Sequence, residues 1–304
     1  MPSKKLNTRS YIEGILASFL FGCTPVFIKK VSANAYTIGV VRLAIASILV
    51  YFLFVGYKRL KGLNKKDWKS LAVIGLVFGL HWVTYFTAVK TATPSLAILG
   101  VSSFGIYLLL FDWLIHKKKP TAFNWAMIAL AVCGILLIVP EFTLGNNYTL
   151  GLLIALVSAF FFAILPLLQQ KNKHIHSYTR AWGQYSFALI FFTFFISETE
   201  WNLSPSDWGY LGILAILCTL GAHTLWLRAT TNLPNTSSGL IYYLSIPVAM
   251  IVSYFFLDEA MPAQKILGAV LIVMSNVIGV GRQILRNQIA KRDLSNSEIK
   301  INQG

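Results

Sequence analysis

Two histidines lie inside long apolar stretches of the sequence. A titratable ring is costly there unless it has a hydrogen-bond partner or a functional role. His81 ends a Gly-Leu-His triplet, and His223 ends a Gly-Ala-His triplet 142 positions later. Histidine titrates near neutral pH, so the pair can take part in proton coupling or bind a carboxylate. The alternative is a neutral ring that donates one N–H to a neighbouring helix, and the sequence leaves both open.

Aromatic and basic side chains accompany these histidines. Three aromatic residues lie within a helical turn of them and can stack on a planar or apolar substrate, or simply pack. Lys29 ends the first apolar stretch, where it can attract an anion or extend its ammonium group to the membrane surface. We predict a substrate-binding set that comprises His81, Trp82, Tyr85, His223, Trp226 and Lys29.

Other polar groups and the prolines receive different roles. Arg42 and Gln184 occupy equivalent positions in the two halves, and we interpret both as structural, through helix capping or bonds between helices. Pro25 and Pro247 lie inside apolar stretches, where a missing N–H permits a kink, so we predict a part in gating. No carboxylate lies deep in an apolar stretch, although exporters of cationic drugs usually need one there.

The composition makes lipid the expected solvent. The 304 residues are 56% hydrophobic and 12% charged, about half the charge of a soluble domain. The net charge of +15 would suggest nucleic acid as the partner of a soluble protein. Here the basic residues lie in short loops between apolar stretches, so we exclude nucleic acid and expect a bilayer. The three cysteines lack metal-ligand spacing, and we expect no metal and no cofactor.

Ten apolar stretches are long enough to cross a membrane as helices. Strands are excluded because the stretches are long and show no alternation. The predicted fold class is therefore an all-α polytopic membrane protein with ten transmembrane helices. The spans are Tyr11–Ile28, Tyr36–Tyr57, Ser70–Val89, Pro94–Ile115, Phe123–Val139, Leu150–Leu168, Ala181–Ser197, Trp208–Leu227, Ser237–Leu257 and Ile266–Ile284.

The basic residues predict the orientation of these spans. With the N-terminus inside, the inner segments hold 21 of the 26 lysines and arginines, in agreement with the positive-inside rule. No cleavage site follows the basic N-terminus, so the first stretch is read as an uncleaved span. We expect a multi-pass protein of the inner (plasma) membrane with both termini in the cytoplasm.

The two halves of the sequence match each other at a shift of 142 positions. Tyr36-Thr37 then meets Tyr178-Thr179, and Pro120 meets Pro262. Each half holds five spans, so the second enters the membrane from the opposite side, which is an inverted repeat. We predict repeats over residues 1–140 and 141–285 around a central cavity, followed by a basic polar tail over 286–304.

The order of several motifs resembles a known family. The second half contains YYLSIPV at 242–248, FLDE at 256–259 and QKILGAVLI at 264–272. The first half contains FGCTPVFIK at 21–29 and RLAIA at 42–46. On these motifs the chain resembles the EamA-type members of the drug/metabolite transporter superfamily, which have two repeats of five helices. The resemblance covers roughly residues 10–285.

The resemblance implies a basket of helices around a central cavity that works by alternating access. It also implies structural roles for Glu259, in an acidic turn, and for Gly268, on the last helix. The first half departs from the pattern, because Gly105 stands where Pro247 does and His116-Lys117 stand where Asp258-Glu259 do. The family moves amino acids, other metabolites, nucleotide precursors and drugs, and membership does not choose among them.

Among membrane proteins, the sequence favours a transporter over an enzyme and over a sensor or scaffold. We predict a secondary transporter, an exporter of a small neutral, zwitterionic or anionic metabolite such as an amino acid. The alternatives are a sensor or scaffold without transport and an exporter of drug-like compounds. An enzyme is disfavoured because the chain has no HExxH, no GxSxG and no grouped carboxylates, and it lacks a P-loop for ATP. Proton coupling and the oligomeric state stay open.

Overall fold

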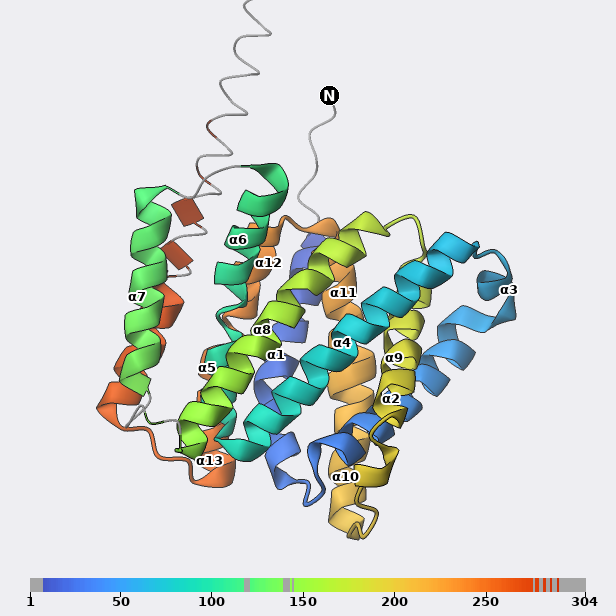
Figure 1. The fold of residues 1–304 in the computed structure, drawn as a ribbon, viewed down its shortest axis with the longest axis horizontal. Helices are drawn as coiled ribbons and strands as arrows, with labels where there is room; N and C mark the ends of the chain where they lie inside the picture. The colour runs from blue at the N-terminus through green and yellow to red at the C-terminus, as the bar shows by residue number, and fades with distance from the viewer. Residues whose placement is uncertain are drawn as a thin grey trace, which may run out of the picture.

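The computed structural model describes residues 8–117, 121–138, 143, 145–275 and a few positions between 277 and 289. Every regular element within these ranges is a helix, and the helices form one bundle (Figure 1). The predicted tail over 286–304 falls outside the described residues except for Ile289. The expectation of an all-helical chain is confirmed for this described part.

The helices follow one another with short connections. In chain order they are α1 Thr8–Lys30, α2 Ala35–Val50, η1 Tyr51–Val55, α3 Gly56–Lys61, α4 Lys65–Thr91, α5 Pro94–Val101, α6 Phe104–His116, α7 Ala122–Ile138, α8 Asn147–Lys171, α9 Ser177–Thr193, η2 Ile196–Glu198, α10 Pro205–Ile213, η3 Leu214–Gly221, α11 Ala222–Asn232, α12 Asn235–Tyr242 and α13 Ser245–Leu257. The segments η1 and η3 are π-helical and continue the helices before them without a break.

Seven helical stretches of the described chain are long and apolar enough to cross a membrane. They are Thr8–Lys30, Ala35–Lys61, Lys65–Thr91, Pro94–Ile115, Asn147–Lys171, Pro205–Asn232 and Ser237–Leu257. Two shorter apolar helices cover Ala122–Ile138 and Ala263–Ser275. α9 is a further helix of 17 residues, over Ser177–Thr193. The chain is therefore a multi-pass membrane protein.

Several helices begin earlier than the apolar stretches that predicted them. α4 begins at Lys65, before the expected Ser70, because Asn64 and Asp67 form a reciprocal capping box. α10 begins at Pro205 for the same reason, with Ser204 as the cap. A cap satisfies the free N–H groups of the first turn, so polar residues can start a helix outside the lipid.

Two predicted spans are each broken into two helices. The break between α5 and α6 falls at Ser102-Ser103, and the break between α12 and α13 falls at Tyr243-Leu244. Pro247 is the third residue of α13, within the first turn, where a missing N–H breaks no helical bond. The break between α5 and α6 is formed without a proline at the corresponding place.

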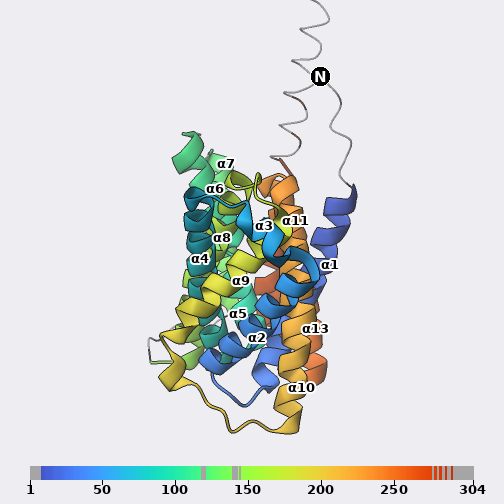
Figure 2. The ribbon, with the colours of Figure 1, turned by 90° about the vertical axis from the view of Figure 1, so that its right-hand side faces the viewer.

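The helices enclose a core near the middle of the bundle. α4 packs against α8 and α9, and α1 packs against α11 and α13. Figure 2 shows α1 and α13 on one side, α4 and α8 on the other, and α2 and α9 between them. We call the end that carries Lys58, Arg59 and Lys171 the basic end, and the end that carries Glu200, Asp207 and Glu259 the acidic end.

Gly268 lies where two helix backbones touch. A Cβ on Gly268 would stand 2.6 Å from the carbonyl oxygen of Gly134, on α7, and 2.6 Å from the Ile138 side chain. We expect Gly268→Ala to separate these helices and lower the free energy of unfolding by about 1–3 kcal/mol. Thermal unfolding of purified protein measures the loss. Gly212→Ala is the control, because a Cβ there meets nothing within 4 Å; equal stability of both variants would contradict the prediction.

Candidate functional site

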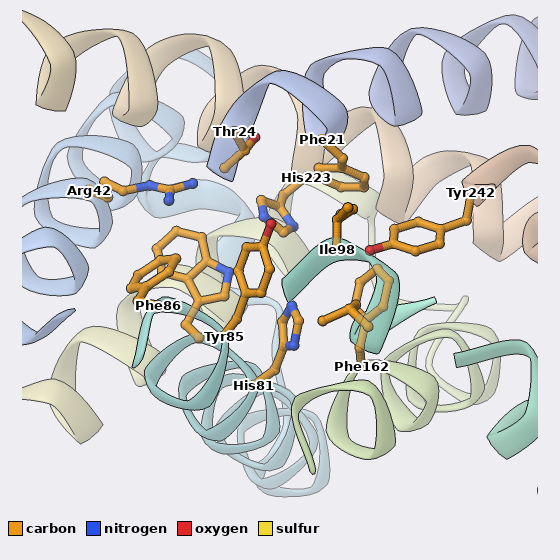
Figure 3. Close-up of a pocket in the computed structure, with 12 residues that line it drawn as sticks. Phe21, Thr24, Arg42, His81, Tyr85, Phe86, Ile98, Phe162, His223 and Tyr242 are labelled. Carbon is orange, nitrogen blue, oxygen red and sulfur yellow. The ribbon is translucent and has the colours of Figure 1, made fainter. Parts of the chain in front are cut away.

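A small cavity lies at the centre of the bundle, where side chains from seven helices converge (Figure 3). Its volume is about 20 Å³, room for about one water molecule. Every lining residue is at most 7% exposed, so the site is closed to solvent in this conformation. Its lining residues are Phe21, Thr24, Arg42, His81, Trp82, Tyr85, Phe86, Ile98, Val101, Phe162, His223 and Tyr242.

His81 is fixed by a serine on a neighbouring helix. Its Nδ1 lies 2.7 Å from the hydroxyl and 3.1 Å from the carbonyl oxygen of Ser158, on α8. The Ser158 hydroxyl donates in turn to the His81 carbonyl oxygen at 3.0 Å. The ring stacks on Phe162 at 4.7 Å and on Tyr85 at 5.8 Å. These contacts set the orientation of the imidazole and join α4 to α8.

His223 has an aromatic environment instead. Its ring lies 4.8 Å from Phe21, 4.9 Å from Phe78 and 5.4 Å from Trp82, measured between ring centroids. Among the described residues, no hydrogen bond to its ring nitrogens is formed. The two histidines of the repeat thus line one cavity in different settings, one bonded and one surrounded by rings.

Arg42 enters the same cavity from α2 and is fully buried. Its Cζ lies 4.3 Å above the Trp82 ring and 4.9 Å above the Phe86 ring, a cation–π arrangement. Its Nε donates to the Thr219 hydroxyl at 3.0 Å. Within the described chain, Nη1 and Nη2 have no hydrogen-bond partner. Figure 3 shows the guanidinium directed toward the space beside Tyr85 and His223.

The π-helical segment η3 positions the group that holds Arg42. The Thr219 hydroxyl donates to the Leu214 carbonyl oxygen at 2.8 Å, five residues earlier. The Tyr185 hydroxyl donates to the Thr219 carbonyl oxygen at 3.1 Å. π-helical turns are frequent at functional sites because they alter the register of side chains and free backbone groups. Here the turn places Thr219 opposite α2.

A second, smaller cavity continues from His223 toward the basic end. It has a volume of about 10 Å³ and includes Trp226, Gln184 and Gln169 in its lining. Gln169 donates to Gln184 at 2.9 Å, which gives Gln184 a bond between α8 and α9. The indole N–H of Trp226 has no partner among the described residues.

Lys29 lies at the acidic end and does not line either cavity. Its ammonium donates to the carbonyl oxygens of Val89, Lys90 and Ala92, at 3.3, 3.0 and 2.8 Å. Lys90 donates in return to the Val31 carbonyl oxygen. Each lysine therefore caps the end of the other's helix, a favourable position for a cation. This reciprocal contact holds the ends of α1 and α4 together.

Glu259 closes another part of the acidic end. Its carboxylate accepts from Lys265 at 2.6 Å and from the Ser95 hydroxyl, at the start of α5. Burial favours the neutral carboxyl, but the bonds from Lys265 and Ser95 outweigh it and hold the pKa of Glu259 below its ordinary value. The charged group thus joins α5 to the segment after α13.

An ion pair joins two helices at the basic end. Arg228, on α11, donates to Glu13, on α1, at 2.6 Å, and their side chains are 18% and 10% exposed. The same arginine donates to the Tyr178 hydroxyl at 2.9 Å. The exposed Arg9 also reaches Glu13 at 2.9 Å. These bonds join α1, α9 and α11 where the bundle meets the surface.

Sequence reasoning and the structure overlap in part at the site. His81, Trp82, Tyr85 and His223 come together at the central cavity, and Trp226 lines the smaller one. Lys29, Pro25 and Pro247 line neither, whereas Arg42, interpreted as structural, lines the central one. Other lining residues, among them Thr24, Phe86, Phe162 and Tyr242, were not predicted from the sequence. The spacing on α4 indicates Phe86, since it lies four residues after Trp82 and shares its face.

The described residues do not provide a metal site, since no group of three or more His, Cys, Asp or Glu gathers among them. What remains is a buried, polar, aromatic cavity inside a bundle of membrane-spanning helices, with both ends of the bundle closed by bonds between helices. Secondary transporters are built in this way, with their sites near the middle of the membrane.

The pattern of the EamA-like transporter family matches residues 8–139 and 149–279. The chain belongs to this family, as the motifs had predicted.

Relatives across bacteria, archaea and animals support this. An uncharacterized transporter of Archaeoglobus fulgidus is 24% identical over 91% of this chain and 99% of its own length. The uncharacterized transporter YwfM of Bacillus subtilis is 21% identical, over 87% and 91%. Human solute carrier family 35 member G1 is 22% identical, over 86% and 76%. A protein of known crystal structure, 16% identical, shares the fold with a TM-score of 0.68 over 92% of this chain and 99% of its own.

Proposed function

We propose that this transporter is a secondary exporter of a small neutral, zwitterionic or anionic metabolite, such as an amino acid, and that it works by alternating access. The observation that carries the proposal is the central cavity, where His81, His223 and Arg42 meet a wall of aromatic rings. Buried polar groups at membrane depth are costly, and a site for a polar cargo explains their presence.

Closure at both ends supports alternating access. The pair Glu13–Arg228 joins helices at the basic end, and Lys29 and Glu259 join helices at the acidic end. Opening one set of bonds at a time would expose the cavity to one side only. Pro25, within α1, and the turn before Pro247 are the proposed points of bending during that change.

The full topology is part of the proposal. Ten spans would form two inverted repeats over 1–140 and 141–285, with a cytoplasmic tail over 286–304. The breaks in α5–α6 and α12–α13 support it, because they lie about 141 positions apart. The helices that follow them, α6 and α13, both end at a left-handed residue, Lys117 and Asp258. The basic end would face the cytoplasm of a cell whose inner membrane holds the protein.

Reporter fusions test this topology. A reporter joined after Gly145 should report the outside, and one joined after Lys173 should report the cytoplasm, since the basic residues favour the inner side. A periplasmic phosphatase and a cytoplasmic fluorescent protein are the paired reporters. The opposite result at both sites would reverse the orientation and leave the fold untouched.

Flux through proteoliposomes tests transport itself. Vesicles with purified protein are loaded with a mixture of amino acids and small organic acids, and the release of each is followed by mass spectrometry. We expect release of at least one compound above that from protein-free vesicles. Release of none, together with unchanged metabolite release from a deletion strain, would favour a sensor or scaffold. Release of cationic dyes instead would favour a drug exporter.

A further inference from the structure

The charge of Arg42 is buried without a counter-ion. Nε is bonded to Thr219, while Nη1 and Nη2 have no partner in the described part of the chain. A guanidinium stays charged and carries five N–H donors, so several donors here face the cavity unused. A buried charge is stable only when it is paired, which points to a partner that this conformation lacks.

The described side chains offer no anion to fill that place. No carboxylate lines the cavity around Arg42. The described acidic groups close to cationic partners lie at the two ends of the bundle, as Glu13 and Glu259 do. The ring faces of Trp82 and Phe86 attract the guanidinium of Arg42. They do not replace the hydrogen-bond acceptors that Nη1 and Nη2 lack among the described residues. One positive charge is therefore left for a ligand.

We propose that Nη1 and Nη2 of Arg42 bind the carboxylate of an organic monoanion that carries no ammonium group. A guanidinium fork matches a carboxylate with two parallel bonds. An amino acid would bring an ammonium group into the same cavity, where the described lining has no carboxylate to pair with it. The inference rests on the proposed transport function and narrows its range of cargo.

The surroundings complete the ligand chemistry. Across the cavity from Arg42, the wall is formed by rings such as Phe21, Phe162 and Tyr242, which favour an apolar or aromatic body (Figure 3). Thr219 fixes Nε from the π-helical turn, so the fork is oriented before the anion arrives. Preorganisation of this kind reduces the entropy lost on binding.

Binding of matched probes to the purified full-length protein tests the proposal. The probes share one skeleton and differ in charge: 3-phenylpropionate, its amide, phenylalanine and 3-phenylpropylamine, in chloride-free buffer. We expect 3-phenylpropionate to bind at least about tenfold more tightly than the other three, since charge-assisted bonds are lost or an ammonium is left unpaired. Titration calorimetry and ligand-induced thermal stabilisation give the affinities.

Two substitutions assign the effect to Arg42. Arg42→Gln should reduce the ratio of affinities for 3-phenylpropionate and its amide to about one. Arg42→Lys keeps the charge, loses the fork and should give an intermediate ratio even if the glutamine variant does not fold. Arg180→Gln is the matched control. Arg180 is also buried, but its Nε donates to the Ile175 carbonyl oxygen and its Nη1 to Gln169 and Thr231, and it does not line the central cavity, so the ratio should stay that of the wild type.

Three results would overturn the proposal. They are equal binding of 3-phenylpropionate and its amide, equal or tighter binding of phenylalanine, and an undiminished preference for the carboxylate in both Arg42 variants. Stabilisation by chloride alone to the same extent would also overturn it, because an inorganic ion would then be the partner. None of these binding results would contradict the proposal that the protein is a transporter. That proposal would be contradicted by vesicles that release none of the loaded compounds.

Discussion

Arg228→Gln is expected to open the basic end of the bundle. The substitution removes the donors that reach Glu13 at 2.6 Å and Tyr178 at 2.9 Å, which join α1, α9 and α11. Hydrogen bonds to charged groups contribute about 1.5–3 kcal/mol, and both side chains of the ion pair are mostly buried. The population open at this end should rise about tenfold or more, since 1.4 kcal/mol is a factor of ten.

Labelling of an introduced cysteine measures that opening. Thr230 is buried, lines the smaller cavity and lies on α11, near the basic end. In a background with Cys23, Cys133 and Cys218 replaced, Thr230→Cys should react with a membrane-impermeant maleimide about ten times faster when Arg228→Gln is added.

Arg9→Gln is the matched control for this experiment. Arg9 also bonds to Glu13, but its side chain is 75% exposed, and exposed ion pairs contribute little. We expect labelling close to that of the parent. If Arg228→Gln and Arg9→Gln label at the same rate as the parent, the ion pair does not close this end.

Replacing either cavity histidine, His81 or His223, with glutamine is expected to lower transport and flatten its dependence on pH. Glutamine keeps hydrogen bonding but does not titrate, whereas histidine changes charge between about pH 5 and 8. Besides the two histidines, the residues with a charge or a hydroxyl that line the same cavity are Thr24, Arg42, Tyr85 and Tyr242. A charged imidazole needs water or an anion beside it, and the closed cavity holds about one water molecule. Proton binding should therefore accompany opening of the cavity.

The measurement is flux against pH, between about 5.5 and 7.5, for wild type and for His81→Gln and His223→Gln at matched expression. The coupling is limited by the difference in proton affinity between the two conformations, about 1.4 kcal/mol per pKa unit. Ser158→Ala should reproduce part of the His81→Gln loss of rate, because Ser158 orients that ring, and should keep the pH dependence.

His174→Gln is the control for the loss of a titratable ring. His174 is mostly exposed near the basic end and contacts Asp67 at 2.8 Å, a bond that glutamine can also donate. Its flux and pH profile should match the wild type. Unchanged rate and unchanged profile in both cavity variants would leave His81 and His223 with a purely structural role.

The helical, membrane-spanning character of the chain followed from the sequence alone. Lipid cannot bond to the backbone, so long apolar stretches had to be helices, and the motifs around Pro247 and Gly268 indicated the family. The helix ends were less predictable. Capping by Asn64 and Ser204 starts two helices in polar sequence, and hydropathy is insensitive to caps.

The composition of the cavity was predictable only in part. The repeat gave His81 and His223 equivalent positions in the two halves, and because those spans run in opposite directions we expected them on opposite sides of the midplane; that both line one cavity is visible only in the structure. The environment of each ring was not predictable, because Ser158 and Phe78 come from elsewhere in the chain and reach the histidines only after the helices pack.

Lys29 and Arg42 show what only the tertiary structure decided. Both are cations near the ends or within the first turns of apolar stretches, and the sequence favoured a ligand role for Lys29 and a structural one for Arg42. In the folded chain, Lys29 is occupied by three carbonyl oxygens at the end of α4, while Arg42 keeps two nitrogens unbonded beside the cavity. The sequence determines which charged side chains enter the membrane. Packing between distant helices determines which of them finds a partner within the protein. That partner is a backbone or hydroxyl group, whose position no local sequence pattern encodes.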